Sequence, residues 1–236
     1  MRPMGNSWIS LIVLYLFSQV QGPAPPDLPL EKGSYWVYRG NVAWTAANSA
    51  TVQRQSIEWR TEVTEVIERD SLVVAVLKGH PRDLISFEPK RQPGLHLLVQ
   101  VSGRKHYMVS APRAETVLKR IKDPSDLLAD LFQEGEIFLE TPLSLGQRFC
   151  ETAGLARTDW MYCWIVEEER TPTVKRVPGV PSMWDGPEYG IYRRTLPSHE
   201  VLGFAPGIGV TSYDFMQNSS VSEVQLKLVE FGRSKP

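Results

Sequence analysis

The chain has 236 residues, and its 26 Lys and Arg side chains nearly balance its 27 Asp and Glu side chains, giving a formal net charge of −1. A surface that binds nucleic acid needs many basic contacts to phosphate, so this balance argues against a nucleic-acid partner. Hydrophobic residues make up 42% of the chain, enough to fill the core of one all-β domain of this length.

The first 22 residues have the pattern of an export signal. Arg2 gives a positive start, residues 8–17 are almost wholly apolar, and small and polar residues follow. The apolar run fits a secretory segment of about 7–15 residues and is short for a membrane span of about 20. We expect residues 1–22 to be a signal peptide cleaved after Gly22 or after Ser18, with an uncleaved N-terminal anchor as the alternative.

An export signal places the mature protein in the periplasm, at the cell surface or outside the cell. No Cys lies near residue 20, so the sequence does not indicate a bacterial lipid anchor.

Strand patterns dominate residues 23–110. Residues 56–66 alternate between an apolar face with Ile57 and a polar face with Glu58, as in a strand with one wet side. Residues 72–77 form a continuous apolar run whose β-branched content favours a strand over a helix fragment. The predicted strands are 35–38, 56–66, 72–77, 95–101 and 106–109.

The hydrophobic period changes over residues 111–141. Residues 114–121 can form a short helix, and Asp123-Pro124 is typical of a second helix start. Four apolar side chains would then share one helical face. These are Leu127, Leu128, Leu131 and Phe132. We expect a helical linker or insert that lies against a sheet.

Strand patterns return over residues 142–236. The predicted strands are 148–151, 159–167, 190–196, 201–204, 210–216 and 222–231. The last two would form a closing hairpin.

Two short patterns occur twice. The sequence that begins at Pro29 returns at Pro142, and Pro93-Gly94 returns as Pro206-Gly207, both at an offset of 113 residues. The shared offset predicts two copies of one β unit within one compact domain, although such dipeptides are common enough for coincidence to be the alternative. The predicted fold class is therefore mainly β: a curved antiparallel sheet or half-barrel, built from two β units joined by a short helical insert.

The chain has two cysteines, Cys150 and Cys163. They fall on two predicted strands joined by a short loop, and an exported chain meets an oxidising compartment. We therefore predict a disulfide between them, with two buried thiols as the alternative. A bridge closing a loop this short contributes about 3 kcal/mol.

Both ends of the chain carry a pattern that resembles a loose group of exported bacterial proteins of unknown function. The matching residues are Pro29, Leu30, Gly33, Trp36, Tyr38, Phe204, Pro206, Gly207, Gly209, Val210 and Tyr213. The resemblance implies a curved antiparallel sheet similar to that of lipoprotein-localisation carriers. It thins out in the middle of the chain, and its motifs are structural, so it implies no catalytic residues.

The sequence predicts no catalytic residue, cofactor site or metal site. His80, His96, His106 and His199 lack metal-ligand spacing, and we expect surface residues rather than ligands. No Gly-x-Ser-x-Gly elbow is present, and no helix pattern follows the glycines at 206–209 to bind a phosphate.

Acidic and aromatic residues allow a carbohydrate hypothesis. Four acids lie near aromatic residues in the sequence, and a glycosidase needs paired carboxylates beside its sugar. They are Asp159, Asp185, Glu188 and Asp214. The alternative is a solvated acidic face, and most Trp residues on strands belong to a core.

The leading hypothesis is a non-enzymatic exported β protein. Its concave face would hold a lipid or other apolar or amphipathic ligand, or an envelope protein partner. The candidate ligand contacts are Trp160, Trp164, Trp184, Leu97 and Leu226. The alternatives are a carbohydrate-active or carbohydrate-binding protein and a structural envelope component without a pocket.

Overall fold

The structure is a computed structural model that describes residues 27–45, 51–90, 92–128, 131, 137–150, 152–182, 184–217 and 222–234. The predicted signal segment 1–22 lies outside the described residues. Within the described ranges, no helix combines the length and apolar character needed to cross a bilayer.

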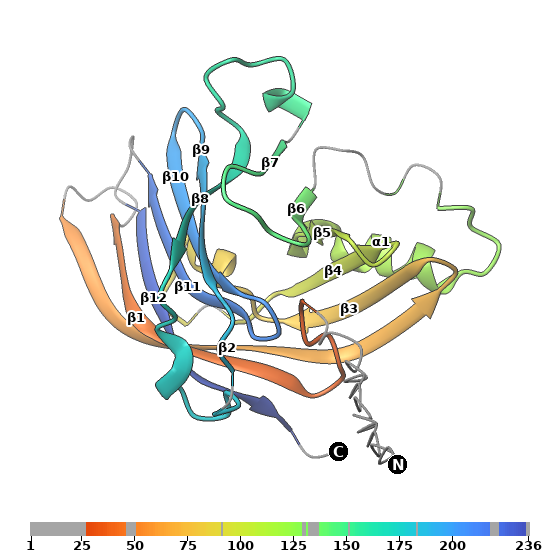
Figure 1. Ribbon diagram of the computed structural model, residues 1–236, viewed down its shortest axis with the longest axis horizontal. Helices are drawn as coiled ribbons and strands as arrows, with labels where there is room; N and C mark the ends of the chain where they lie inside the picture. Colours follow the sequence, from red (N-terminus) through yellow and green to blue (C-terminus); the bar gives the residue numbers. More distant parts are fainter. Residues whose placement is uncertain are drawn as a thin grey trace, which may run out of the picture.

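One antiparallel sheet of 12 strands forms the body of the protein and curls into a nearly closed barrel (Figure 1). The strands are β1 Ser34–Thr45, β2 Val52–Arg69, β3 Leu72–Lys78, β4 Leu95–Val101, β5 Lys105–Val109, β6 Ile137–Glu140, β7 Arg148–Cys150, β8 Cys163–Arg170, β9 Glu188–Arg194, β10 Ser198–Ala205, β11 Gly209–Gln217 and β12 Ser222–Arg233. The helices are η1 Pro81–Leu84, α1 Ala111–Lys122, η3 Thr152–Gly154 and η4 Val174–Arg176.

The first and last strands meet in the middle of the sheet. The strand order is β6-β5-β4-β3-β2-β1-β12-β11-β10-β9-β8-β7, so each half of the chain runs outward from the β1–β12 pair. In that pair, Trp36 lies opposite Phe231. The two edge strands, β6 and β7, are consecutive in the chain, and the Gln147 side chain bonds the Glu140 carbonyl at 2.9 Å between them.

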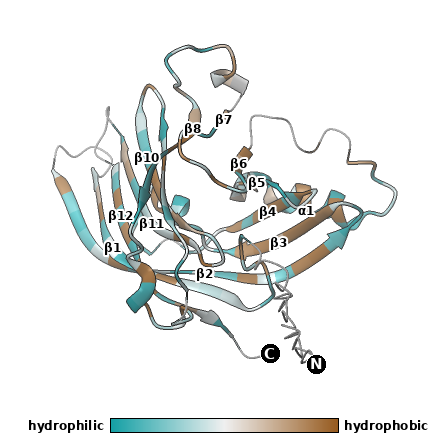
Figure 2. Cartoon of the chain, in the orientation of Figure 1, coloured by the Kyte–Doolittle hydropathy of each residue, from teal (hydrophilic) through white to brown (hydrophobic). Residues whose placement is uncertain are grey.

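Alternate residues of each strand face opposite sides of the sheet. On β4, His96 and Leu98 face the hollow of the barrel, where they line cavities. Leu97 and Val99 face the other side and are fully buried, because α1 packs on the outer face of β4 and β5. With both faces covered, β3 and β4 are among the most apolar strands in Figure 2, and the continuous apolar run 72–77 is a strand as predicted.

The chain after α1 does not form the predicted second helix over residues 123–128. Asp123 instead bonds the backbone N–H of Ser125 at 2.9 Å, and Arg120 forms an ion pair with Asp126 at 2.7 Å. The Arg69 guanidinium donates hydrogen bonds to backbone carbonyls of this segment, among them that of Asp123 at 2.8 Å. These side-chain bonds compete with helical backbone bonds, so the helix predicted from Asp123-Pro124 was wrong over these residues.

The two-copy prediction is not confirmed. Trp36 and Phe149 are separated by the same offset as the repeated patterns. Trp36 lies on β1, the first strand of the first half, and Phe149 lies on β7, the first strand of the second half. Between the repeated anchors, however, three strands lie in the first half and four in the second, because Pro93-Gly94 precedes β4 whereas Pro206-Gly207 joins β10 to β11. The expected linker 111–141 also contains β6, which pairs with β5 and forms one edge of the sheet.

The predicted disulfide is confirmed. Cys150 on β7 is bonded to Cys163 on β8, and the two residues face each other in the antiparallel register. Because β7 has only three residues and stands at the sheet edge, this bond ties the edge to its neighbour.

Replacing both cysteines (Cys150→Ser with Cys163→Ser) should lower the free energy of unfolding by about 3 kcal/mol, since the open chain gains entropy when unfolded. Urea unfolding of the oxidised proteins measures the difference. Dithiothreitol should lower the stability of the wild type and leave the double variant unchanged. Equal stabilities of the oxidised wild type and the double variant would contradict the prediction.

Candidate functional site

A short segment between β3 and β4 crosses the hollow of the barrel. We call residues 80–87 the plug segment; it contains η1, drawn in gold in Figure 1. Asp83 ties the start of this segment to the residue before β4, because one carboxylate oxygen accepts the N–H groups of His80 at 3.2 Å and Gly94 at 2.9 Å. The plug segment is therefore a tight turn held by its own carboxylate.

The second oxygen of Asp83 bonds His96 Nε2 on β4 at 2.8 Å. Both side chains are buried. Burial alone would raise the pKa of the Asp83 carboxyl, but the bonds from His96 and from the Gly94 and His80 amides outweigh it and lower the pKa. Asp83 is therefore ionised at neutral pH and anchors the plug segment to β4.

Arg82 anchors the plug segment to the opposite wall. Its guanidinium forms two bonds to the Glu200 carboxylate on β10, at 2.6 and 3.0 Å. Arg193 and the Tyr213 hydroxyl also donate to Glu200, at 3.2 and 3.0 Å. Glu200 is 2% exposed, and a carboxylate so buried is tolerated only when paired and hydrogen-bonded.

The same contacts shift the pKa values of Glu200 and Tyr213. Burial alone would raise the pKa of Glu200, but Arg82, Arg193 and the Tyr213 hydroxyl lower it below its ordinary value. Burial first, and then the charge of Glu200, raises the pKa of Tyr213 well above its usual range. Tyr213 therefore stays protonated and donates to an ionised Glu200.

Trp164 lies beside this charged cluster. The guanidinium carbons of Arg82 and Arg193 are 5.4 and 5.9 Å from its ring centroid, within cation–π range. Trp164 is 1% exposed. It therefore supports the two arginines from within the core.

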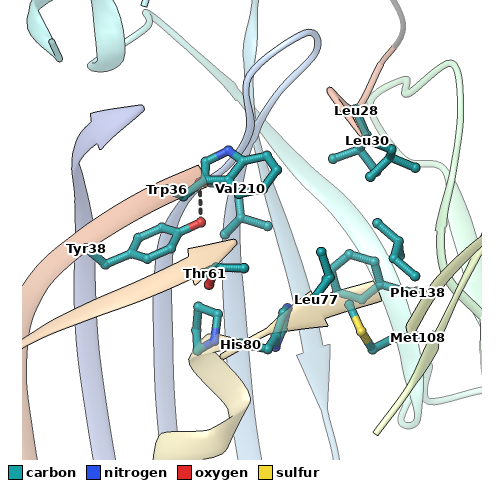
Figure 3. A pocket seen from close by; sticks show the side chains of 12 residues that line it. Leu28, Leu30, Trp36, Tyr38, Thr61, Leu77, His80, Met108, Phe138 and Val210 are labelled. Carbon is teal, nitrogen blue, oxygen red and sulfur yellow. Dashed lines mark hydrogen bonds between the residues drawn. The ribbon is translucent and has the colours of Figure 1, made fainter. Parts of the chain in front are cut away.

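The plug segment separates two cavities. The mouth cavity, about 480 Å³, is lined by Arg82, Asp83, Ile85, His96, Glu200 and Phe215 among others. The inner cavity, about 40 Å³, is almost wholly apolar and is lined by Trp36, Tyr38, Leu77, His80, Met108 and Phe138 among others (Figure 3). Of these two cavities, the mouth cavity has the size of a ligand site, about 300–1,000 Å³.

The predicted ligand contacts do not converge on these cavities. Trp160 is half exposed on a loop, stacked 3.5 Å from the Arg148 guanidinium, and Trp184 donates its ring N–H to the Pro206 carbonyl at 2.9 Å. Leu97 lies on the outer face under α1, and Leu226 is a buried residue of β12. None of these four lines the mouth or the inner cavity.

The acids of the carbohydrate hypothesis also lie apart. Buried Glu188 accepts bonds from Thr173 and Thr211, at 2.8 and 2.7 Å, and so fastens the segment after β8. Asp159 is paired with Arg157 on an exposed loop, and Asp214 is exposed on β11. None of the four acids lines either cavity.

The residues that build the site were not recognised in the sequence. The expectation of surface histidines is wrong for His80, His96 and His106, which are all buried. A proline after His80, followed by Asp83, does signal the capped turn. Nothing in the sequence pairs Arg82 with Glu200, which is 118 residues further on.

No protein-family model matches this chain, and no curated protein matches it. Two solved structures are similar in shape. A candidate exported protein with a YmcC-like fold from Bacteroides fragilis is 12% identical, with 89% of this chain and 100% of that chain covered and a TM-score of 0.40. A candidate lipoprotein from Parabacteroides distasonis is 12% identical over the same shares, with a TM-score of 0.35. At these TM-scores neither likeness carries an argument about this chain.

The buried histidines predict a loss of stability in mild acid. Burial lowers the pKa of His106. Burial, together with the nearby charges of His96 and Arg82, lowers the pKa of His80 well below its ordinary value. Above about pH 6.5, the ordinary histidine pKa, both are neutral in the folded and unfolded states. Below it the unfolded chain binds more protons than the folded protein, so the free energy of unfolding decreases as the pH is lowered, by up to about 1.4 kcal/mol per pH unit for each group.

Urea unfolding between pH 8 and pH 5 should show this slope, and His106→Leu should reduce it. The same slope in His106→Leu and in the wild type would exclude His106 as a contributor.

Proposed function

We propose that this protein is a non-enzymatic exported β protein that binds a small amphipathic molecule in the mouth cavity. The observation that carries the proposal is this cavity of about 480 Å³ inside the curved sheet. Its volume suits a small ligand rather than a macromolecule. Export rests on the signal pattern in residues 1–22.

The mouth cavity is lined by both apolar and charged side chains. Ile85, Met108 and Phe215 contribute apolar surface, while Arg82 and Glu200 contribute charge. A ligand with both an apolar and a polar part can satisfy both. Arg82 and Glu200 hold each other in place, so the charged part of the lining is ordered before a ligand binds.

A wholly apolar ligand fits this structure less well. The apolar inner cavity, about 40 Å³, has room for only a few water molecules. Among the ligands expected for the concave face, the geometry therefore favours an amphipathic one.

A carbohydrate site would need an aromatic-lined cleft with paired carboxylates. Trp160, Trp164 and Trp184 lie on separate elements with separate partners, so no observation favours that function.

A fluorescent amphiphile, 1-anilinonaphthalene-8-sulfonate, should bind the folded protein saturably and one to one. Ser110→Trp, an exposed position that lines the mouth cavity, should weaken binding at least tenfold by filling the space. Glu115→Trp adds the same side chain at an exposed position of α1 that does not line the cavity and should leave binding unchanged. Unsaturable uptake, or equal binding by both variants, would refute the site, with circular dichroism confirming that both fold.

A further inference from the structure

The plug segment is the partition between a polar and an apolar compartment. Its first residues, His80 and Pro81, line the inner cavity, and the next, Arg82 and Asp83, line the mouth cavity. Met108 on β5 borders both cavities. Displacement of these few residues would therefore join the two compartments into one site with a charged entrance and an apolar interior.

The attachments of the plug segment differ on its two sides. On the β4 side, Asp83 is tied to His96 and to the Gly94 backbone, next to where the segment leaves the sheet. Across the hollow, the Arg82 side chain reaches Glu200 on β10. At the rim, the Ile85 carbonyl accepts from the Ser222 hydroxyl, and Phe87 packs edge-on against Trp44 with ring centroids 4.8 Å apart. The Arg82–Glu200 pair is the charged attachment to the far wall.

Glu200 occupies a ready-made anion site. Two guanidinium groups and one hydroxyl donate to its carboxylate. This donor set binds carboxylate or sulfate groups in general, with guanidinium as the preferred partner. A ligand anion can compete with Glu200 for the guanidinium of Arg82.

The inner cavity is suited to an alkyl chain once it is enlarged. Leu28, Leu30, Leu77, Leu98, Met108 and Phe138 are among its lining residues. While His80 and Pro81 form one wall, the space of about 40 Å³ admits no chain. Burial of the CH₂ groups of a chain there is favourable and can offset the loss of the contacts made by the plug segment.

We propose that the plug segment is a gate held closed by the Arg82–Glu200 ion pair, and that an anionic amphiphile with one alkyl chain opens it. The anionic head group takes the place of Glu200 at Arg82, while Glu200 keeps its bonds from Arg193 and the Tyr213 hydroxyl. The plug segment then moves aside, and the alkyl chain enters the inner cavity. The gate rests on the proposed function, because it names the ligand class and the entry step for the same mouth cavity.

The decisive variant is Glu200→Gln, which removes the competing charge but keeps an oxygen acceptor. Its affinity for dodecanoate, measured by titration calorimetry below the critical micelle concentration, should rise at least tenfold. Its affinity for dodecyltrimethylammonium, with the same chain and the opposite charge, should not rise. A purely structural role for Glu200 predicts lower or unchanged affinity for both amphiphiles, and that result would overturn the gate.

Glu188→Gln is the matched control. Glu188 is also a glutamate of the second half that is 2% exposed, but its partners are threonines and it lines neither cavity. Its replacement should leave the dodecanoate affinity within twofold of wild type. A rise equal to that of Glu200→Gln would mean that loosening the fold, and not loss of the Arg82–Glu200 ion pair, admits the ligand.

Hydrogen exchange on the wild-type protein tests the gate if Glu200→Gln does not fold. Saturating dodecanoate should speed exchange of the amides of Asp83 and Ile85, which are bonded within the plug segment, while the β1–β12 amides stay protected. If dodecanoate binds and these amides are unchanged or slower, the gate is wrong and the mouth-cavity site stands. If neither dodecanoate nor the fluorescent amphiphile binds, the proposed function fails as well.

Discussion

The pairing of β1 with β12 is the constraint on which the rest of the sheet depends. It joins the two halves of the chain through one backbone ladder, and each half then adds its strands outward from it. Such a ladder joins residues almost 200 apart, for example Trp36 and Phe231, and therefore forms at a high entropic cost of loop closure. Every later strand pairs with its neighbour in the chain, so one long-range choice sets the whole topology.

A sheet joined only along this line would still be open at β6 and β7. The Gln147 side chain links these two edges through the Glu140 carbonyl. Across the interior, Trp36 donates to the Ile208 carbonyl at 2.6 Å and Tyr38 to the Val210 carbonyl at 3.0 Å. Arg82 adds the charged link to Glu200 across the hollow. Buried polar bonds of this kind contribute little net stability but cost much when broken, so they specify one arrangement of the two halves. The same link makes the interior of the barrel a place where charge and apolar surface adjoin.

Local sequence patterns predicted the elements well where short-range physics governs them. Alternation predicted β2, the β-branched run predicted β3, and the two cysteines predicted the β7–β8 bond. The prediction of a second helix was wrong over residues 123–128 because Arg69, on a distant strand, takes the backbone carbonyls of that segment. The repeat prediction relied on dipeptides that mark turns, and turns recur at different strand positions in the two halves.

The sequence by itself determined that the described chain is a β protein with a disulfide, because strand periodicity and cysteine placement are local signals. Only the tertiary structure decided which side chains line the interior of the barrel. Leu97, apolar and on a strand, belongs to the outer face because α1 covers that side. Arg82 and Glu200, which no local pattern in the sequence connects, are brought together inside the barrel. A buried ion pair leaves no periodic trace in a sequence, since its partners meet only after the sheet has closed around them.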